Sequence, residues 1–272
     1  MSDPWRRSAA RLLDALLPTG CILCERPLRS ASPGRPPAFC LECERALPWW
    51  RRVDGCPRCG GDRITPAGCE RCLADASPLQ ASHVALRYAG PIARWIPALK
   101  LARRRPVLPV ERAIDALAAA LAERVEQESN GRIDLVASLP LHPTRRRERG
   151  FNQVDRLARA VATRLGRPFR TDLLDRVRPT RPQASLRGEA RRRNVRGAFR
   201  ARRPIPRDLR IALVDDVLTT GATLEAGASA LLEAGALEVR GVALAATLPP
   251  ARKRRRDGTS GRRAVSGSGG SP

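Results

Sequence analysis

Residues 211–223 form the segment whose residue types and order point most directly to chemistry. They read IALVDDVLTTGAT, so that four apolar residues precede two carboxylates and a bend rich in hydroxyl groups. The apolar residues predict a buried parallel strand, and open α/β sheets bind ligands at the carboxyl ends of such strands, where Asp215 and Asp216 stand. Two adjacent carboxylates can accept hydrogen bonds from a vicinal diol, such as the hydroxyl pair of a ribose.

The bend after the aspartates has the composition of a phosphate site. It opens a predicted helix, whose first backbone N–H groups and positive dipole end attract an anion. Gly221 permits a close approach and a backbone conformation that few other residues adopt. A diol site beside a phosphate site describes a ribose 5-phosphate, whereas the alternative is an ordinary βα junction with two capping aspartates. The candidate phosphate ligands are Thr219, Thr220, Gly221, Ala222 and Thr223.

The eight cysteines form a second set of candidate ligands, and all of them belong to C-x-x-C pairs. Zinc prefers four thiolates in a tetrahedral arrangement, and one such pair supplies two of them. The spacing fits two successive zinc ribbons, although an interleaved pairing would leave the same sequence. Redox-active pairs and bystander thiols are the alternatives. The successive ribbons would combine Cys21 and Cys24 with Cys40 and Cys43, and Cys56 and Cys59 with Cys69 and Cys72.

Zinc held by four thiolates has no open coordination position, so the predicted role of these sites is structural rather than catalytic. A module of about sixty residues with few large apolar side chains cannot fold on burial alone, so metal would supply the missing stability. We therefore expect one or two structural zinc ions. Trp49 and Trp50, which lie between the ribbons, are either a stacking contact for a partner or core residues.

The hydrophobic periodicity of the remaining chain predicts an α/β fold with a mostly parallel sheet, flanked by helices and preceded by the small cysteine module. We expect an N-terminal helix over 1–17, a double zinc ribbon over 18–76, the α/β domain over 80–250 and a disordered basic tail over 251–272. The arginine-rich segments 143–150 and 178–196 lack periodicity and are predicted as loops, the second of them mobile. Strands are expected at 82–88, 133–139, 210–217 and 239–247, and helices at 91–103, 110–128, 152–165 and 223–234.

Composition restricts the classes of function. Of the 272 residues, 42% are hydrophobic, so the chain can bury a sizeable core and global disorder is excluded. The net charge of +24 predicts attraction to polyanions, whereas an aromatic content of 3% argues against an extended base-stacking platform. The sequence has no uncharged apolar run of about 18 residues and no convincing secretion signal, so we expect a cytoplasmic protein without membrane insertion.

Segment 211–223 resembles the signature of type I phosphoribosyltransferases, the enzymes that use phosphoribosyl pyrophosphate (PRPP). The chain as a whole is similar to the ComF family, bacterial competence-associated proteins with a cysteine-rich N-terminus and a phosphoribosyltransferase-like body. The resemblance spans residues 17–250, and the two loops carry extra arginines beyond the family pattern. The further residues that carry it are Tyr88-Ala89-Gly90, Leu99-Lys100, Arg149-Gly150-Phe151-Asn152-Gln153, Gln183, Leu186, Arg191, Asn194-Val195 and Ala198-Phe199.

The resemblance implies a role for each part of the site. Asp215 and Asp216 would hold the ribose hydroxyls, and Thr219–Thr223 would hold the 5-phosphate. The loop at 139–150 would bind pyrophosphate, and the loop at 178–196 would close over it.

The implied reaction breaks the bond between C1 of the ribose and pyrophosphate. Mg²⁺ and arginine side chains would neutralise the charge of the leaving group. The arginines implied for this role are Arg149 and Arg191, and Lys100 is a further candidate contact for a phosphate.

The predicted function is therefore a Mg²⁺-dependent phosphoribosyl transfer to an unknown acceptor, in a protein that acts in DNA uptake during natural competence. One alternative is a PRPP sensor without turnover. Another is a non-catalytic factor whose basic loops and zinc ribbons contact single-stranded DNA and DNA-uptake proteins. An intact ribose-phosphate segment is hard to explain by DNA binding alone, which favours PRPP or a related ribose 5-phosphate as the ligand.

Overall fold

The computed structural model describes residues 20–28, 38–51, 54–60, 64–74, 76–101, 108–179 and 188–247. The helix expected at 1–17 and the disordered tail expected at 251–272 lie outside the described residues, so both stay predictions.

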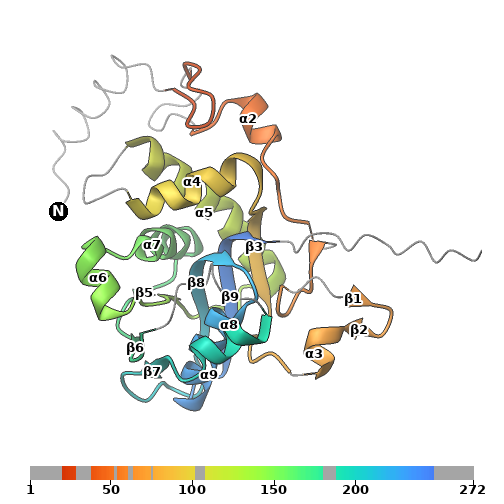
Figure 1. Cartoon of the computed structure of the whole chain (residues 1–272), viewed down its shortest axis with the longest axis vertical. Helices are drawn as coiled ribbons and strands as arrows, with labels where there is room; N and C mark the ends of the chain where they lie inside the picture. Colours follow the sequence, from red (N-terminus) through yellow and green to blue (C-terminus); the bar gives the residue numbers. More distant parts are fainter. Residues whose placement is uncertain are drawn as a thin grey trace, which may run out of the picture.

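A five-stranded parallel sheet forms the centre of the α/β domain, in the order β3-β9-β8-β4-β5 (Figure 1). β8 lies in the middle and pairs in parallel with β4 on one side and β9 on the other. The parallel sheet predicted from the sequence is confirmed, and the strand that carries the two aspartates is its central strand. The strands are β3 (Ser82–Arg87), β4 (Leu135–Ser138), β5 (Phe169–Arg170), β8 (Arg210–Leu218) and β9 (Glu238–Ala246).

Alternate residues of β8 point into two hydrophobic clusters, one on each face of the sheet. Ala212 and Val214 pack with residues of α4 (Gly90–Leu101), α5 (Leu108–Ser129) and α7 (Gln153–Leu165). Ile211 and Leu213 pack with residues of α9 (Ala222–Glu233). Because helices cover both faces, β8 is a continuous apolar run rather than an alternating one.

The loop expected at 143–150 is wrong, because residues Pro143–Arg149 form helix α6. Proline stands at the start of the helix, where its fixed φ angle and missing N–H cost nothing. His142 precedes it, and its Nδ1 accepts a hydrogen bond of 3.3 Å from the backbone N–H of Thr144. Gly150 ends the helix in the left-handed conformation, with a φ of 77°. The residues that favour the two ends of a helix therefore explain why α6 forms although it has no apolar face.

The second arginine-rich segment is also more ordered than expected. Residues Gly188–Val195 form helix α8, whereas residues 180–187 lie outside the described part of the chain. Two short strands flank the segment in the sequence and pair with each other in antiparallel fashion, β6 (Leu174–Arg176) before it and β7 (Phe199–Ala201) after it. The mobile loop predicted over 178–196 is therefore wrong for the part that α8 occupies.

The cysteine-rich segment joins the domain along the edge of the sheet. Residues 48–50 run antiparallel to β3: the N–H of Trp50 donates to the carbonyl of Ala85 at 2.9 Å, and that of Arg87 donates to the carbonyl of Pro48 at 2.7 Å. Trp50 is 6% exposed and belongs to the core cluster of α9, which confirms the core interpretation for this residue. The short elements of the segment are α2 (Leu41–Arg45), β1 (Ile64–Thr65), β2 (Gly68–Cys69) and α3 (Glu70–Ala74).

Asn152 connects the end of β4 to the start of α7. Its Nδ2 donates to the carbonyl of Leu139 at 3.0 Å and to Oδ1 of Asp155 at 2.7 Å, and its Oδ1 accepts from the N–H of Val154 at 3.3 Å. The residue is 5% exposed, so water cannot replace these partners. We expect Asn152→Ala to lower the free energy of unfolding by about 2 kcal/mol, because it leaves a buried carbonyl unpaired and removes a helix cap.

Urea denaturation measures this loss. Thr163→Ala is the matched control, because its side chain bonds only within the same helix and faces solvent, so its cost should stay within about 0.5 kcal/mol. Equal stability of the two variants would contradict the connecting role of Asn152.

Candidate functional site

The two aspartates lie in the second half of β8, which continues to Leu218 before the chain bends. Gly221 follows with a φ of 74°, a conformation that favours glycine, and occupies the N-cap position of α9. Because the cap residue has no side chain, it offers no side-chain acceptor to the first N–H groups of α9. Thr219 and Thr220 are half-buried beside them. The bend therefore presents backbone donors and hydroxyls together, which suits a phosphate.

A chain of hydrogen bonds links Asp216 to the start of α7 and the end of α6. The Nε2 of Gln153 donates to Oδ2 of Asp216 at 3.0 Å, and the Nη1 of Arg149 donates to Oε1 of Gln153 at 3.2 Å. Oδ1 of Asp215 accepts from the backbone N–H of Asp216 at 2.8 Å. The structure thus brings Arg149, a candidate from the sequence, next to the aspartates through Gln153.

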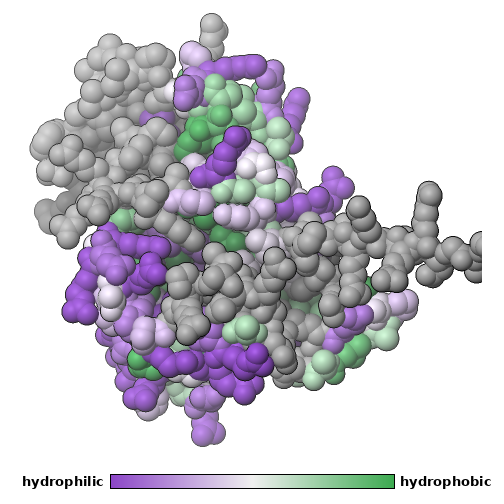
Figure 2. All heavy atoms as spheres, viewed as in Figure 1, coloured by the Kyte–Doolittle hydropathy of each residue, from purple (hydrophilic) through white to green (hydrophobic). Residues whose placement is uncertain are grey.

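Arg149 differs from the other arginines of α6. Figure 2 shows hydrophilic side chains gathered over this helix, and Arg145, Arg146 and Arg147 are exposed. Arg149 is half-buried and faces Gln153 instead. The arrangement separates one arginine that is linked to Asp216 through Gln153 from three that form a charged surface.

Gln153 orients the carboxylate of Asp216, and its role was not evident from the sequence. We expect Gln153→Ala to weaken the binding of a ribose 5-phosphate ligand about tenfold, because both Asp216 and Arg149 lose the partner that holds them in place. Isothermal calorimetry with PRPP and Mg²⁺ measures the change. Thr163→Ala, on the same helix, should leave affinity unchanged, and an unaltered affinity of Gln153→Ala would exclude the orienting role.

Arg176 of β6 is a charged residue of the site that sequence reasoning missed. Its guanidinium lies over the ring of Phe199, 5.4 Å from the ring centre. Burial lowers the pKa of Arg176, the negative charge of Asp215 opposes this shift, and the positive charge of Arg145 adds to it. Arg176 is therefore within electrostatic reach of Asp215. No local pattern marks it, because only the hairpin of β6 and β7 brings it there.

The structure describes the backbone but not the side chains of the other two predicted cations. Lys100 belongs to α4 and Arg191 to α8, and both side chains lie outside the described residues. Helix α8 packs against α9, the helix that begins at the bend. Nη2 of Arg178 donates to the carbonyls of Asn194 and Arg196, at 3.1 and 2.6 Å, and so holds the C-terminal end of α8.

The eight cysteines gather into two successive clusters of four, so the interleaved pairing does not occur. Within each cluster the ligand atoms lie within 4.8 Å of one another, and none of the eight cysteines forms a disulfide. Three Sγ···Sγ distances are 3.6, 3.7 and 3.9 Å, between Cys59 and Cys69, Cys24 and Cys40, and Cys56 and Cys72. A tetrahedral site with Zn–S bonds of about 2.3 Å has edges of about 3.8 Å, whereas a disulfide needs about 2.05 Å. Both clusters therefore fit a four-thiolate zinc site.

The backbone around Cys21 favours a thiolate at that one position of the first cluster, whereas burial raises the pKa of Cys43 in the same cluster. Burial alone raises the pKa of Cys21, but hydrogen bonds from the backbone N–H groups of Cys40 and Leu23 lower it to about 6. In the second cluster, burial raises the pKa of Cys72 to about 11. Binding of a metal ion to this second cluster must therefore release a proton from Cys72.

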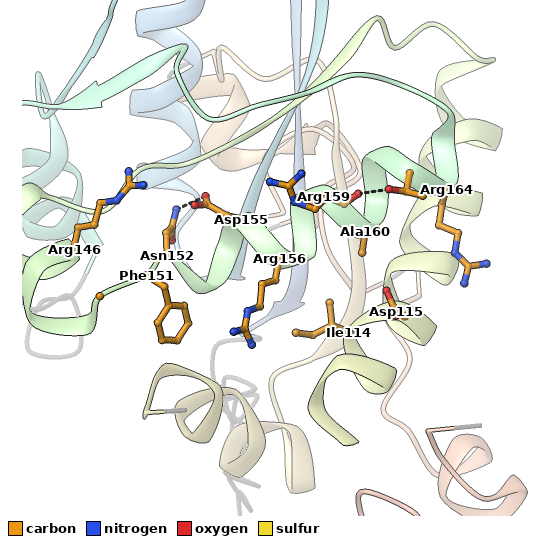
Figure 3. Close-up of a pocket in the computed structure, with 12 residues that line it drawn as sticks. Ile114, Asp115, Arg146, Phe151, Asn152, Asp155, Arg156, Arg159, Ala160 and Arg164 are labelled. Carbon is orange, nitrogen blue, oxygen red and sulfur yellow. Dashed lines mark hydrogen bonds between the residues drawn. The ribbon is translucent and has the colours of Figure 1, made fainter. Parts of the chain in front are cut away.

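A cavity of about 550 Å³ lies between α5 and α7, away from the two aspartates (Figure 3). Its walls include Phe151 and Arg156, which point to the same side, whereas the side chains of Arg146 and Arg159 point to the other. The arginines of its wall therefore do not all point to one position.

Comparisons with known proteins agree with this geometry. A family model described as phosphoribosyl transferase domain matches residues 156–263, which include the aspartates and the bend. The DNA utilization protein YhgH of Salmonella typhimurium is 35% identical over 241 residues, covering 85% of this chain and 99% of that protein. Competence protein F of Haemophilus influenzae is 27% identical over 224 residues, covering 81% of this chain and 93% of that protein.

Among solved structures, a purine phosphoribosyltransferase from Pyrococcus horikoshii aligns with 49% of this chain and 72% of its own, at 18% identity and a TM-score of 0.30. No helix in the described part of the chain is long and apolar enough to cross a membrane. The match to nearly the full length of relatives more than 30% identical, together with the parallel sheet and the two cysteine clusters, shows that the chain belongs to the ComF family of phosphoribosyltransferase-like proteins.

Proposed function

We propose that this protein binds PRPP together with Mg²⁺ at residues 215–223 and transfers its phosphoribosyl group to an acceptor. The observation that carries the proposal is the geometry of the bend. The central strand carries two aspartates and ends at Leu218, and Gly221 then opens α9 in a left-handed conformation. Donors for a phosphate and acceptors for a diol therefore lie side by side at the carboxyl end of the sheet.

Each residue of the site has a role in this proposal. Asp215 and Asp216 accept the ribose hydroxyls, and the backbone and hydroxyls of Thr219–Thr223 hold the 5-phosphate. Arg149 is close enough to act on the pyrophosphate, because Gln153 ties it to Asp216. Arg191 of α8 is proposed as a second contact of the leaving group, and Lys100 as a further phosphate contact.

The leaving pyrophosphate carries the charge that the transition state must stabilise. When bound with PRPP, Mg²⁺ supplies charge neutralisation on the pyrophosphate oxygens. Arginine side chains that are already fixed in place also neutralise this charge, and they need no rearrangement during the reaction. Such preorganised electrostatic stabilisation is usually the largest single contribution to catalysis. Helix α8, which packs against α9 and is held at its C-terminal end by Arg178, is proposed as the segment that excludes water from the reaction.

Pyrophosphate release tests the enzymatic proposal. The protein, PRPP and Mg²⁺ are incubated with a panel of nucleobases, and inorganic pyrophosphate is measured with a coupled assay. Release that depends on one base, and that is absent with Asp216→Asn, supports transfer. If the protein binds PRPP but releases no pyrophosphate with any of the bases, the result favours a sensor. If it does not bind PRPP, the result rejects the site itself.

The exposed arginines of α6 and the net charge of +24 favour contact with a polyanion as a second function. The names of the relatives, DNA utilization protein and Competence protein F, suggest that the polyanion is DNA. We place the protein in the cytoplasm, where it would meet incoming single strands and DNA-uptake proteins. Fluorescence anisotropy with a labelled single strand should show affinity that falls steeply between 50 and 200 mM salt. Binding that is absent or independent of salt would remove this second function.

A further inference from the structure

The second cysteine cluster contacts Leu218, the residue that precedes the bend of the ribose-phosphate site. Gly60 follows Cys59 directly and has a φ of 67°. A Cβ atom at Gly60 would lie 2.2 Å from Cδ2 of Leu218, so the backbone of the cysteine turn rests against this side chain. Leu218 is 2% exposed and stands immediately before Thr219. The cysteine turn therefore contacts the residue that immediately precedes the bend.

The same cysteine turn is fixed to the edge of the sheet. The N–H of Ser82 donates to the carbonyl of Pro57 at 2.7 Å, and the Oγ of Ser82 donates to the carbonyl of Arg58 at 2.7 Å. Asp54, just before the turn, accepts hydrogen bonds of 2.8 and 2.6 Å from the guanidinium of Arg87 at the end of β3. The turn is thus held between β3 on one side and the last residue of β8 on the other.

A second contact is made with α9, the helix that follows the bend. Ser77, a few residues after Cys72, donates from its Oγ to Oε1 of Glu225 at 2.9 Å. Glu225 lies in the first turn of α9, and its N–H donates to the carbonyl of Gly221 at 2.9 Å. One residue within the second cluster and one residue after it therefore contact the residues on the two sides of the bend.

The first cysteine cluster has a different environment. Cys21 packs in the cluster of α4, α5 and α7, which covers the opposite face of the sheet from α9. Figure 1 shows α2, which follows Cys40, beside α4, whereas β1, β2 and α3 lie near the other end of β3. The first cluster therefore provides an internal control for effects of the second.

We infer that metal binding at Cys56, Cys59, Cys69 and Cys72 and PRPP binding at residues 215–223 are energetically coupled, with Gly60, Leu218, Ser77 and Glu225 carrying the coupling. The inference rests on the proposed function of the bend. Four thiolates on one ion hold the cysteine turn in the shape that supports Leu218, and loss of the ion releases that support. Coupling between binding sites is reciprocal, so PRPP must strengthen metal binding by the factor with which the metal strengthens PRPP binding.

The extent of zinc release from the intact, zinc-loaded protein at equilibrium tests the coupling without any substitution. A colorimetric chelator is titrated to equilibrium with and without saturating PRPP and Mg²⁺. We expect two steps of release, and PRPP should weaken the competition of the chelator for one of the two ions about tenfold, within the range of about 5 to 150-fold found for coupled sites. A Cys24→Ser variant, which lacks a ligand of the first cluster, should retain the step that responds to PRPP. Zinc release that PRPP leaves unchanged would overturn the coupling.

Substitution of glycine tests the contact itself. Gly60→Ala places a methyl group against Leu218 and should weaken PRPP binding about tenfold with the zinc content unchanged. Gly166→Ala is the matched control, because its φ is 62° and its added Cβ would meet nothing within 4 Å. Equal PRPP affinity of the two variants would contradict the coupling, even if Gly60→Ala is less stable.

Calorimetry of the unsubstituted protein with PRPP and Mg²⁺ separates the two claims. Absence of binding rejects the proposed function and the coupling with it. Binding with unchanged zinc release, and with equal affinity of the two glycine variants, rejects the coupling alone.

Discussion

Replacement of Asp215 and Asp216 together by asparagine should lower the affinity for PRPP at least about 100-fold. A hydrogen bond to a charged partner contributes about 1.5 to 3 kcal/mol, and a neutral amide recovers only part of it. The two aspartates would lose this contribution at two ribose hydroxyls, and 1.4 kcal/mol corresponds to a factor of ten. Calorimetry with PRPP and Mg²⁺ measures the loss.

The change has two opposing effects on the fold. Neutralisation of two neighbouring carboxylates removes a like-charge interaction, but it also removes the negative charge of Asp215, which opposes the effect of burial on the pKa of Arg176. Urea denaturation of the double variant separates a loss of stability from a loss of affinity. Asp208→Asn is the matched control, because this exposed aspartate precedes β8 and stands at the opposite end of the strand. PRPP affinity of the double variant within threefold of the control would contradict the role of the aspartates.

Removal of zinc should unfold the cysteine-rich segment while the sheet persists. Structural zinc contributes about 10 to 16 kcal/mol of apparent binding free energy in zinc-finger peptides, and the segment has only short elements of its own. Elemental analysis should find two zinc ions per chain, one for each cluster. After chelation, hydrogen exchange should become fast in residues 38–74 and stay slow in β4 and β8.

A reducing buffer without chelator is the control for this experiment, since it keeps the thiols free without removing metal. Slow exchange of residues 38–74 in the metal-free protein would show that packing against β3 alone maintains the segment. Such a result would contradict the structural role of the metal.

Strong periodicity made the centre of the fold predictable. The apolar run at 211–214 and the helices around Leu117 and Leu157 have patterns long enough to identify them, and the structure confirms the parallel sheet that they implied. β5, β6 and β7 have two or three residues each, which is too short for any pattern. Helix α6 has no apolar face, and the proline at its start and the glycine at its end are its only helix signals in the sequence. The segment was therefore predicted as a loop.

The candidate site was predictable where it is continuous in sequence. Asp215, Asp216 and Gly221 lie within seven residues, and their chemistry is evident from their order. Gln153 and Arg176 reach the same place from distant elements, and a hydrogen bond or a hairpin positions each of them. Sequence spacing allowed two groupings of the cysteines, and only the folded chain separated them.

A crystal structure of the protein soaked with PRPP and Mg²⁺ tests the central claim most directly. We expect density for the 5-phosphate against the backbone N–H groups of residues 219–223 and for the ribose hydroxyls on Asp215 and Asp216. Saturating PRPP that leaves the bend without density, or that binds elsewhere on the molecule, would contradict the account.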